Sequence, residues 1–251
     1  MSHDAPTPRR QAWAWALRTT AFALLGMLAA STTAQLAFPG DRGLAMAVLV
    51  QGLVFLGIGL WGRPSLTVGA LRRWPLLGLG LPMGLLSTWV GEGVSALLGA
   101  PPEGWSLLSK LAVGPESALI LVAAGIVAPL GEELLFRGAI FGALARAGGT
   151  GLPIVGSAAL FGLMHLTPGH AAAAFVSGLC LGWMRAVTGS VWPGVVAHAL
   201  NNLLWWWIAS AGAPPSPSPS PTILGLCAAV WILAIRQWPT GSSVCVKSEP
   251  F

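Results

Sequence analysis

Polar side chains that could do chemistry are rare inside the apolar stretches of this sequence, and most of them fall into three groups. The groups are Glu132 with Glu133 and Arg137, Phe161 with His165, and His198 with Asn202. A carboxyl group can act as a general base, and imidazole or amide groups can assist it or donate hydrogen bonds to developing negative charge. Ionisable side chains are costly in lipid, so these residues are functional candidates if the stretches cross a membrane.

The acidic group has the highest density of charge. Glu133 and Arg137 are four residues apart, so on a helix they can form an ion pair that neutralises the guanidinium. Glu132 points about 100° away around such a helix and keeps a free carboxyl. A carboxyl kept from water can serve as a general base near neutral pH. The alternative interpretation is a charge cluster at a helix end, solvated at the membrane surface.

Each histidine of the other two groups shares a helical face with a residue one turn away. Phe161 precedes His165 by four residues, and the alternative for this His is a core residue with satisfied hydrogen bonds. His198 and Asn202 have the same spacing and can present two hydrogen-bonding groups to one point. The alternative for this pair is a polar contact between helices. A further acidic residue, Glu92, lies in an apolar stretch without an identified partner.

The elements that must position these groups are membrane helices, to judge from the composition. Of 251 residues, 55% are hydrophobic and only 8% are charged, and the mean hydropathy is +0.74. Such a chain cannot cover a water-soluble surface. These values exclude a soluble enzyme, a disordered chain and a nucleic-acid-binding protein, although the pI is about 10.1. The net charge of +5 instead indicates orientation in a membrane.

The apolar runs predict an all-α fold, a polytopic bundle of about eight transmembrane helices, because each span needs roughly 20 apolar residues. The spans lie near 19–38, 43–61, 76–98, 117–136, 152–166, 171–184, 191–210 and 222–238. The chain then divides into a cytoplasmic segment (1–18), N-terminal transmembrane helices (19–110), the helices that carry the polar groups (111–210), and a Pro/Ser-rich connector with the last helix and the tail (211–251). The motif of GxGxxG spacing at 57–62 lies in a span, so we interpret it as helix packing rather than nucleotide binding.

The distribution of Lys and Arg predicts the topology. If eight spans alternate from a cytoplasmic N-terminus, ten basic residues, Arg185 among them, face the cytoplasm, whereas Arg42 and Lys110 face outside. This asymmetry follows the positive-inside rule. With a composition typical of a high-GC bacterium, it predicts an integral protein of the bacterial cytoplasmic membrane with both termini in the cytoplasm.

Helix geometry also predicts the depth of the polar groups. If the fourth helix continues through Gly138–Arg146 to the double glycine Gly148-Gly149, Glu132 lies roughly 22 Å above its inner end. If the next helix starts near Gly151, His165 lies roughly 21 Å along it. These two residues are therefore expected at similar depth on adjacent antiparallel helices. His198 is expected to be shallower, roughly 10 Å from a helix start at Val191, unless Pro193 and Gly194 start that helix deeper in the membrane, which would reduce the mismatch.

The three groups, taken in order, resemble the motifs of a known family. Glu132-Glu133-x-x-x-Arg137, Phe161-x-x-x-His165 and His198-x-x-x-Asn202 are similar to those of the CAAX prenyl protease and bacteriocin-processing family. Members of that family are intramembrane endopeptidases related to the type II CAAX prenyl endopeptidase. The resemblance covers roughly residues 115–210 and leaves the first three spans without a motif.

The resemblance implies a role for each of these residues. Glu132 would be the base that activates water with the assistance of His165, and His198 with Asn202 would stabilise the oxyanion. Glu133 and Arg137 would support the site through their ion pair, and Phe161 would pack beside the pocket. The substrate would be a membrane-anchored protein or peptide in the lipid bilayer, processed as in CAAX cleavage, bacteriocin maturation or removal of a C-terminal sorting tail.

Two alternatives stay open. The first is a zinc site, in which Glu132, His165 and His198 would supply two imidazoles and one carboxylate and leave a position for water. The sequence has no HExxH motif, and we favour a metal-free mechanism that needs no cofactor. The second is a membrane transporter or channel that uses the Glu and His residues as a proton or cation relay. Concentration of the polar groups in three helices favours the protease over this alternative.

Overall fold

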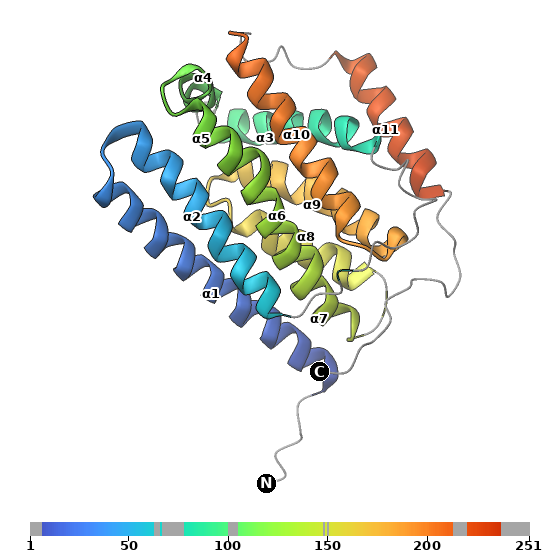
Figure 1. Cartoon of the computed structure of the whole chain (residues 1–251). Coiled ribbons are helices and arrows are strands. Elements are labelled where there is room, and N and C mark those ends of the chain that lie inside the picture. The colour runs from blue at the N-terminus through green and yellow to red at the C-terminus, as the bar shows by residue number, and fades with distance from the viewer. Residues whose placement is uncertain are drawn as a thin grey trace.

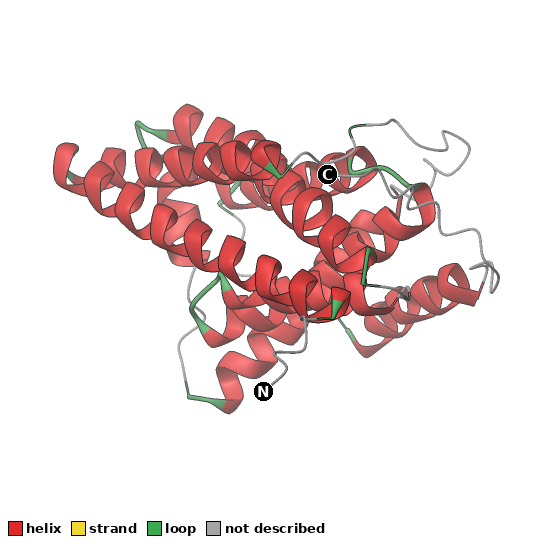
Figure 2. Cartoon of the chain, turned by 90° about the horizontal axis from the view of Figure 1, so that it is seen from below, coloured by secondary structure: helices red, strands yellow, loops and turns green. Residues whose placement is uncertain are grey.

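The structure is a computed structural model, and it describes residues 7–62, 66, 78–99, 105–147, 149, 151–212 and 220–236. Within these ranges the chain forms helices joined by short turns, without a strand (Figure 2). The prediction of an all-α fold is therefore confirmed. Most of the Pro/Ser-rich connector (213–219) lies outside the described residues, as do several basic residues of the topology prediction, namely Arg63, Arg72, Arg73 and Lys247.

The first two helices form a long antiparallel hairpin, α1 (Pro8–Ala37) and α2 (Gly40–Trp61), along one side of the molecule (Figure 1). The start of α1 is fixed by its cap, because Thr7 Oγ1 accepts a hydrogen bond from the Arg10 amide and Pro8 occupies the first helical position. The helix therefore begins well before the predicted start near residue 19. The Arg-rich segment ahead of that position belongs to the same helix.

A single helical path through the centre of the molecule carries the acidic group. It consists of α5 (Ser117–Val122), η2 (Ala123–Val127), α6 (Ala128–Glu133), η3 (Leu134–Ile140) and α7 (Phe141–Ala145), of which η2 and η3 are π-helical. Pro129 lies just after the first π-helical segment and has no amide hydrogen for the helical ladder. The path continues to Ala145, beyond the predicted end of the span at residue 136.

The other helices surround this path. They are α3 (Gly80–Leu97), α4 (Trp105–Val113), α8 (Gly151–Leu163), α9 (Pro168–Thr188), α10 (Trp192–Ser210) and α11 (Pro221–Arg236). The short helix α4 was not predicted. In Figure 1, α10 and the hairpin of α1 and α2 lie on opposite sides of α6, and α8 and α9 lie behind it.

Four helical stretches in the described part of the chain are long and apolar enough to cross a membrane, by length and composition. They are Arg9–Ala37, Gly40–Trp61, Ser117–Ala145 and Pro168–Thr188. The predicted number of eight is not confirmed. Helix α8 shows one reason, because its 13 residues extend only about 20 Å, less than the roughly 30 Å of a bilayer core.

Glycine contacts bring α2 against the central path. A Cβ at Gly131 would collide with the main-chain carbonyl oxygen of Gly52. The backbones of α2 and α6 can approach this closely because neither residue has a side chain. Two turns further along α2, a Cβ at Gly59 would lie 2.8 Å from the Leu134 carbonyl carbon. Gly59 belongs to the motif of GxGxxG spacing, so its interpretation as a helix-packing motif is confirmed.

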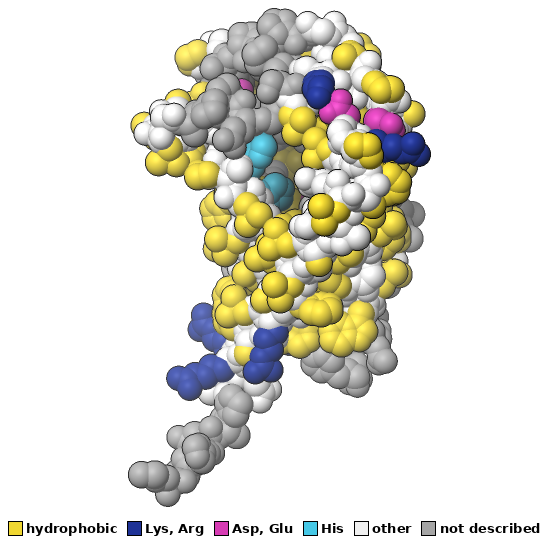
Figure 3. All heavy atoms as spheres, turned by 90° about the vertical axis from the view of Figure 1, so that its left-hand side faces the viewer, with side chains coloured by type: hydrophobic (Ala, Val, Ile, Leu, Met, Phe, Trp, Pro, Cys, Tyr) yellow, Lys and Arg dark blue, Asp and Glu magenta, His cyan; other side chains and the backbone are white. Residues whose placement is uncertain are grey.

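The surface has the pattern of a membrane protein. On the face shown in Figure 3, Lys and Arg side chains gather at one end, charges of both signs lie at the other end, and a broad apolar belt separates them. Large apolar side chains such as Phe22, Leu25 and Leu36 are 63%, 64% and 84% exposed. An exposed apolar belt of this kind fits a lipid environment and not water.

Candidate active site

The acidic group lies on α6 between the two π-helical segments. Both carboxyl groups are shielded from solvent, since Glu132 is 8% exposed and Glu133 is fully buried. Local π-helical geometry is rare and is frequent at functional sites. Here it changes the helical register on both sides of the two glutamates, so the side chains before and after them do not follow α-helical spacing.

The predicted ion pair between Glu133 and Arg137 is confirmed. Glu133 Oε1 accepts a hydrogen bond from Arg137 Nη1 at 3.0 Å, and both side chains have no exposed surface. The guanidinium also lies over the ring of Phe161, with 4.4 Å between Cζ and the ring centroid. A buried cation thus has one carboxylate and one aromatic face as its surroundings, which fixes the relative positions of α6, η3 and α8.

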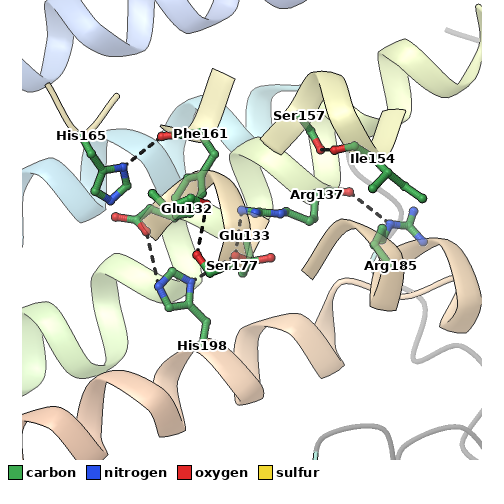
Figure 4. A network of polar contacts seen from close by, with 11 residues as sticks. Glu132, Glu133, Arg137, Ile154, Ser157, Phe161, His165, Ser177, Arg185 and His198 are labelled. Carbon is green, nitrogen blue, oxygen red and sulfur yellow. Dashed lines mark hydrogen bonds and ion pairs between the residues drawn. The ribbon is translucent and has the colours of Figure 1, made fainter. Parts of the chain in front are cut away.

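His198 contacts both glutamates (Figure 4). Its Nδ1 lies 3.1 Å from Glu133 Oε1, and its Nε2 lies 3.7 Å from Glu132 Oε2. The expectation that His198 is shallower than Glu132 is therefore wrong. The reason is that α10 begins inside the protein: Val191 is 1% exposed, and Gly194 packs so closely that a Cβ there would lie 3.0 Å from Glu133 Oε2.

His165 approaches Glu132 from another side. The sequence predicted that His165 lies within a helical span. Helix α8 ends at Leu163, however, so this His lies in the following turn. Its Nδ1 is 3.0 Å from the main-chain oxygen of Phe161, and the two rings meet edge to face with centroids 4.9 Å apart. Figure 4 shows the Glu132 carboxyl group between the imidazoles of His165 and His198.

A cavity of about 250 Å³ adjoins this arrangement. Its lining residues come from α1, α2, the central path and the end of α8: Met27, Gln51, Phe55, Glu132, Phe136, Phe161, Met164, His165 and Leu166. The space exceeds what a single water molecule needs. The molecule therefore places one carboxyl group and one imidazole in the wall of a mainly apolar chamber, and Figure 3 shows a hollow with histidine side chains at the level of the apolar belt.

Asn202 binds the main chain of the first π-helical segment. Its Nδ2 donates to the Ala124 carbonyl oxygen at 2.9 Å. That oxygen lacks its usual helical donor, because the Ala128 amide bonds to Ala123 instead and Pro129 has no amide hydrogen. Asn202 thus joins α10 to the central path, and one of its two amide hydrogens is not needed for this contact.

Sequence reasoning missed two residues that adjoin the site. Arg185 was counted only among the basic residues on the cytoplasmic side. It is 6% exposed, and its Nε donates to the main-chain oxygen of Arg137 at 3.1 Å. Its position at the end of α9 gave no signal for burial. Gln51 lines the cavity from α2, and a signal did exist, since this residue is the one polar side chain between residues 43 and 61.

The side chains do not form a three-ligand metal site in this arrangement. Across the described ranges, no three His, Cys, Asp or Glu side chains are close enough together to hold an ion. His165 directs Nδ1 to a main-chain oxygen, and His198 directs Nδ1 to Glu133. Neither of these contacts engages Nε2, so the absence of a three-residue cluster among the described residues is what separates this arrangement from the considered zinc set of Glu132, His165 and His198.

The fold and the site together define a class: a helical membrane protein with a glutamate and histidine centre beside a partly open, mainly apolar cavity. Residues 114–204 match the family model for Rce1-like proteins, described as type II CAAX prenyl endopeptidase. The match contains all seven residues of the three motifs, so the resemblance is confirmed for this region and indicates a CAAX-type intramembrane protease. No curated protein matches the chain. No solved structure matches it either.

Proposed function

We propose that this protein is an intramembrane endopeptidase in which Glu132 activates water for the hydrolysis of a peptide bond. The observation that carries the proposal is the position of the Glu132 carboxyl group, which lines the cavity together with His165 and lies 3.7 Å from His198 Nε2. Amide hydrolysis requires a base that activates water, an acid that protonates the leaving amine, and hydrogen-bond donors for the oxyanion.

The reaction follows from these positions. Glu132 takes a proton from a water molecule that His165 helps to orient, and the resulting hydroxide attacks the scissile carbonyl carbon. The protonated carboxyl group then delivers that proton to the leaving amine. Glu133 accepts a hydrogen bond from His198 Nδ1, so a protonated imidazole can direct its Nε2 hydrogen at the oxyanion.

Asn202 would supply the second donor to the oxyanion. One of its amide hydrogens is engaged by Ala124, which holds the side chain in place and leaves the other hydrogen for the substrate. Glu133, Arg137 and Phe161 keep their predicted supporting role, because they hold the imidazole and the guanidinium in fixed positions. No metal is required by this mechanism.

The substrate is a membrane-anchored protein or peptide, because the cavity is lined by helices that carry exposed apolar side chains on their outer faces. Prenylated CAAX-like proteins, bacteriocin precursors and C-terminal sorting tails all have this form. We further propose that the protein resides in a bacterial cytoplasmic membrane with both termini in the cytoplasm and that the number of crossings approaches eight. Basic side chains at the N-terminal end of α1 favour this orientation.

The proposal is tested by the Glu132→Gln variant in cells that otherwise lack the protein. New protein termini in the membrane fraction are compared by mass spectrometry between cells with wild type and cells with the variant. The amide is nearly isosteric but cannot accept the proton, so we expect substrate-derived termini to fall by about 10²–10⁴-fold at equal amounts of folded protein. If no terminus depends on Glu132, the protein is not a protease of this kind.

A further inference from the structure

Gln51 is an unexplained polar residue in the middle of a membrane helix. Helix α2 has no other polar side chain between Gly43 and Trp61. A side-chain amide in hydrocarbon loses its hydrogen bonds to water and is costly unless other groups replace them. Gln51 has no hydrogen-bond partner among the residues that the structure describes, although it is half-buried. Such a group is a candidate for contact with a ligand.

The side chain lines the same cavity as Glu132 and His165. The nine lining residues include six apolar ones, so Gln51, Glu132 and His165 alone provide polar groups. Gln51 and Phe55 are one turn apart and present the same face of α2 to this space. The two ionisable groups come from the region matched by the family model, whereas Gln51 comes from α2, outside that region.

The position of Gln51 relative to Glu132 is fixed by the backbone. Each residue is the sequence neighbour of a glycine in the tightest contact between α2 and α6, that of Gly52 with Gly131. No side chain separates the two helices at this point, so neither can shift without a collision of main-chain atoms. An amide on α2 and a carboxyl group on α6 are therefore held at the same level of the bundle.

A substrate backbone has the chemistry that this amide would recognise. A peptide bond must leave helical structure to be cleaved, and its neighbouring N–H and C=O groups then need partners, because hydrocarbon offers none. A glutamine amide can donate to a carbonyl oxygen and accept from an N–H at the same time. We propose that Gln51 binds the extended main chain of the substrate and thereby positions the scissile bond over Glu132. This inference rests on the proposed function.

The test uses the same cellular comparison with three further variants at matched amounts of folded protein. Gln51→Leu removes the amide and keeps the size of the side chain. Gln51→Asn keeps the amide on a shorter stem. Gln35→Leu, the matched control, removes the same amide from an exposed position of α1 away from the cavity. Melting in detergent is measured for each variant to show that the fold is retained.

We expect the Glu132-dependent termini to fall by about tenfold in Gln51→Leu, to recover in part in Gln51→Asn, and to stay at the wild-type level in Gln35→Leu. A synthetic peptide spanning the most abundant cleavage site should then show, with purified protein in vesicles, a loss expressed mainly in KM. Wild-type cleavage by Gln51→Leu, or an equal loss in Gln51→Leu and Gln51→Asn, overturns the binding role while leaving the protease assignment intact. Absence of any Glu132-dependent terminus overturns both.

Discussion

Replacing Glu133 by Gln should destabilise the protein far more than the same change at Glu132. In the wild type, Glu133 Oε1 is 3.0 Å from Arg137 Nη1 and 3.1 Å from His198 Nδ1, and neither partner of the ion pair has exposed surface. The amide oxygen of Gln can still accept these hydrogen bonds. The negative charge is lost, however, and Arg137 remains as an uncompensated buried cation.

The magnitude follows from the burial. Breaking a fully buried ion pair by removal of one charge costs about 3–5 kcal/mol. The Gln amide nitrogen adds to this cost, because the atom it replaces, Glu133 Oε2, has no hydrogen-bond partner and lies close to Gly194. For a chain of this size, such a loss lowers the melting temperature by about 6–20 °C. The matched change at Glu132 leaves the ion pair intact and should shift melting by only a small fraction of this.

The assay is thermal unfolding of the purified variants in one detergent, with the double variant Glu133→Gln/Arg137→Gln as a further test. The double variant removes both charges, so it should recover at least part of the loss, because replacement of a whole buried pair is often close to neutral. Equal melting temperatures for the Glu132→Gln and Glu133→Gln variants would refute the assignment of Glu133 as the structural counter-ion of Arg137.

Three further predictions concern packing, the main-chain contact and the metal. Gly131→Ala should lower the free energy of unfolding by about 1–3 kcal/mol, because the added Cβ collides with the Gly52 carbonyl oxygen. The control Gly142→Ala, whose Cβ meets no atom within 4 Å, should leave the stability unchanged. Equal yields and melting temperatures for the two variants would contradict this packing prediction. Asn202→Ala should cost about 1–3 kcal/mol, because the Ala124 carbonyl loses its donor, and it should slow cleavage by about 10²–10³-fold without abolishing it; unchanged melting would show that the contact is dispensable. Prolonged chelation should leave activity unchanged, and elemental analysis that finds stoichiometric zinc, whose removal stops turnover and whose return restores it, would disprove the metal-free mechanism.

The contacts that could be predicted from the sequence are the local ones. The Glu133–Arg137 ion pair depends on a spacing of four residues within one helical path, and it survives the π-helical segment that begins at Leu134. The edge-to-face contact of Phe161 with His165 depends on the same spacing. In both cases the two residues are close in sequence, so their contact needs no knowledge of the neighbouring helices, although His165 already lies in the turn after α8.

The depth of His198 and the context of His165 could not be predicted in the same way. The first depends on how deeply the start of α10 is buried, which is decided by the contact of Gly194 with Glu133. The second depends on the chain leaving α8 after Leu163, before the predicted end of the span near residue 166. Tertiary contacts set both positions, and no pattern within a single span records them.

The early end of α8 has a consequence for the supply of water. Each turnover consumes one water molecule, and a site between lipid-facing helices must be replenished from the aqueous phase. At this end of α8 the chain makes an irregular turn, in which Leu166 adopts a left-handed conformation with φ of 56°. Because α8 extends only about 20 Å, the turn that carries His165 comes before the helix could complete a crossing of the bilayer core. We infer that water from the aqueous phase reaches the cavity beside this turn.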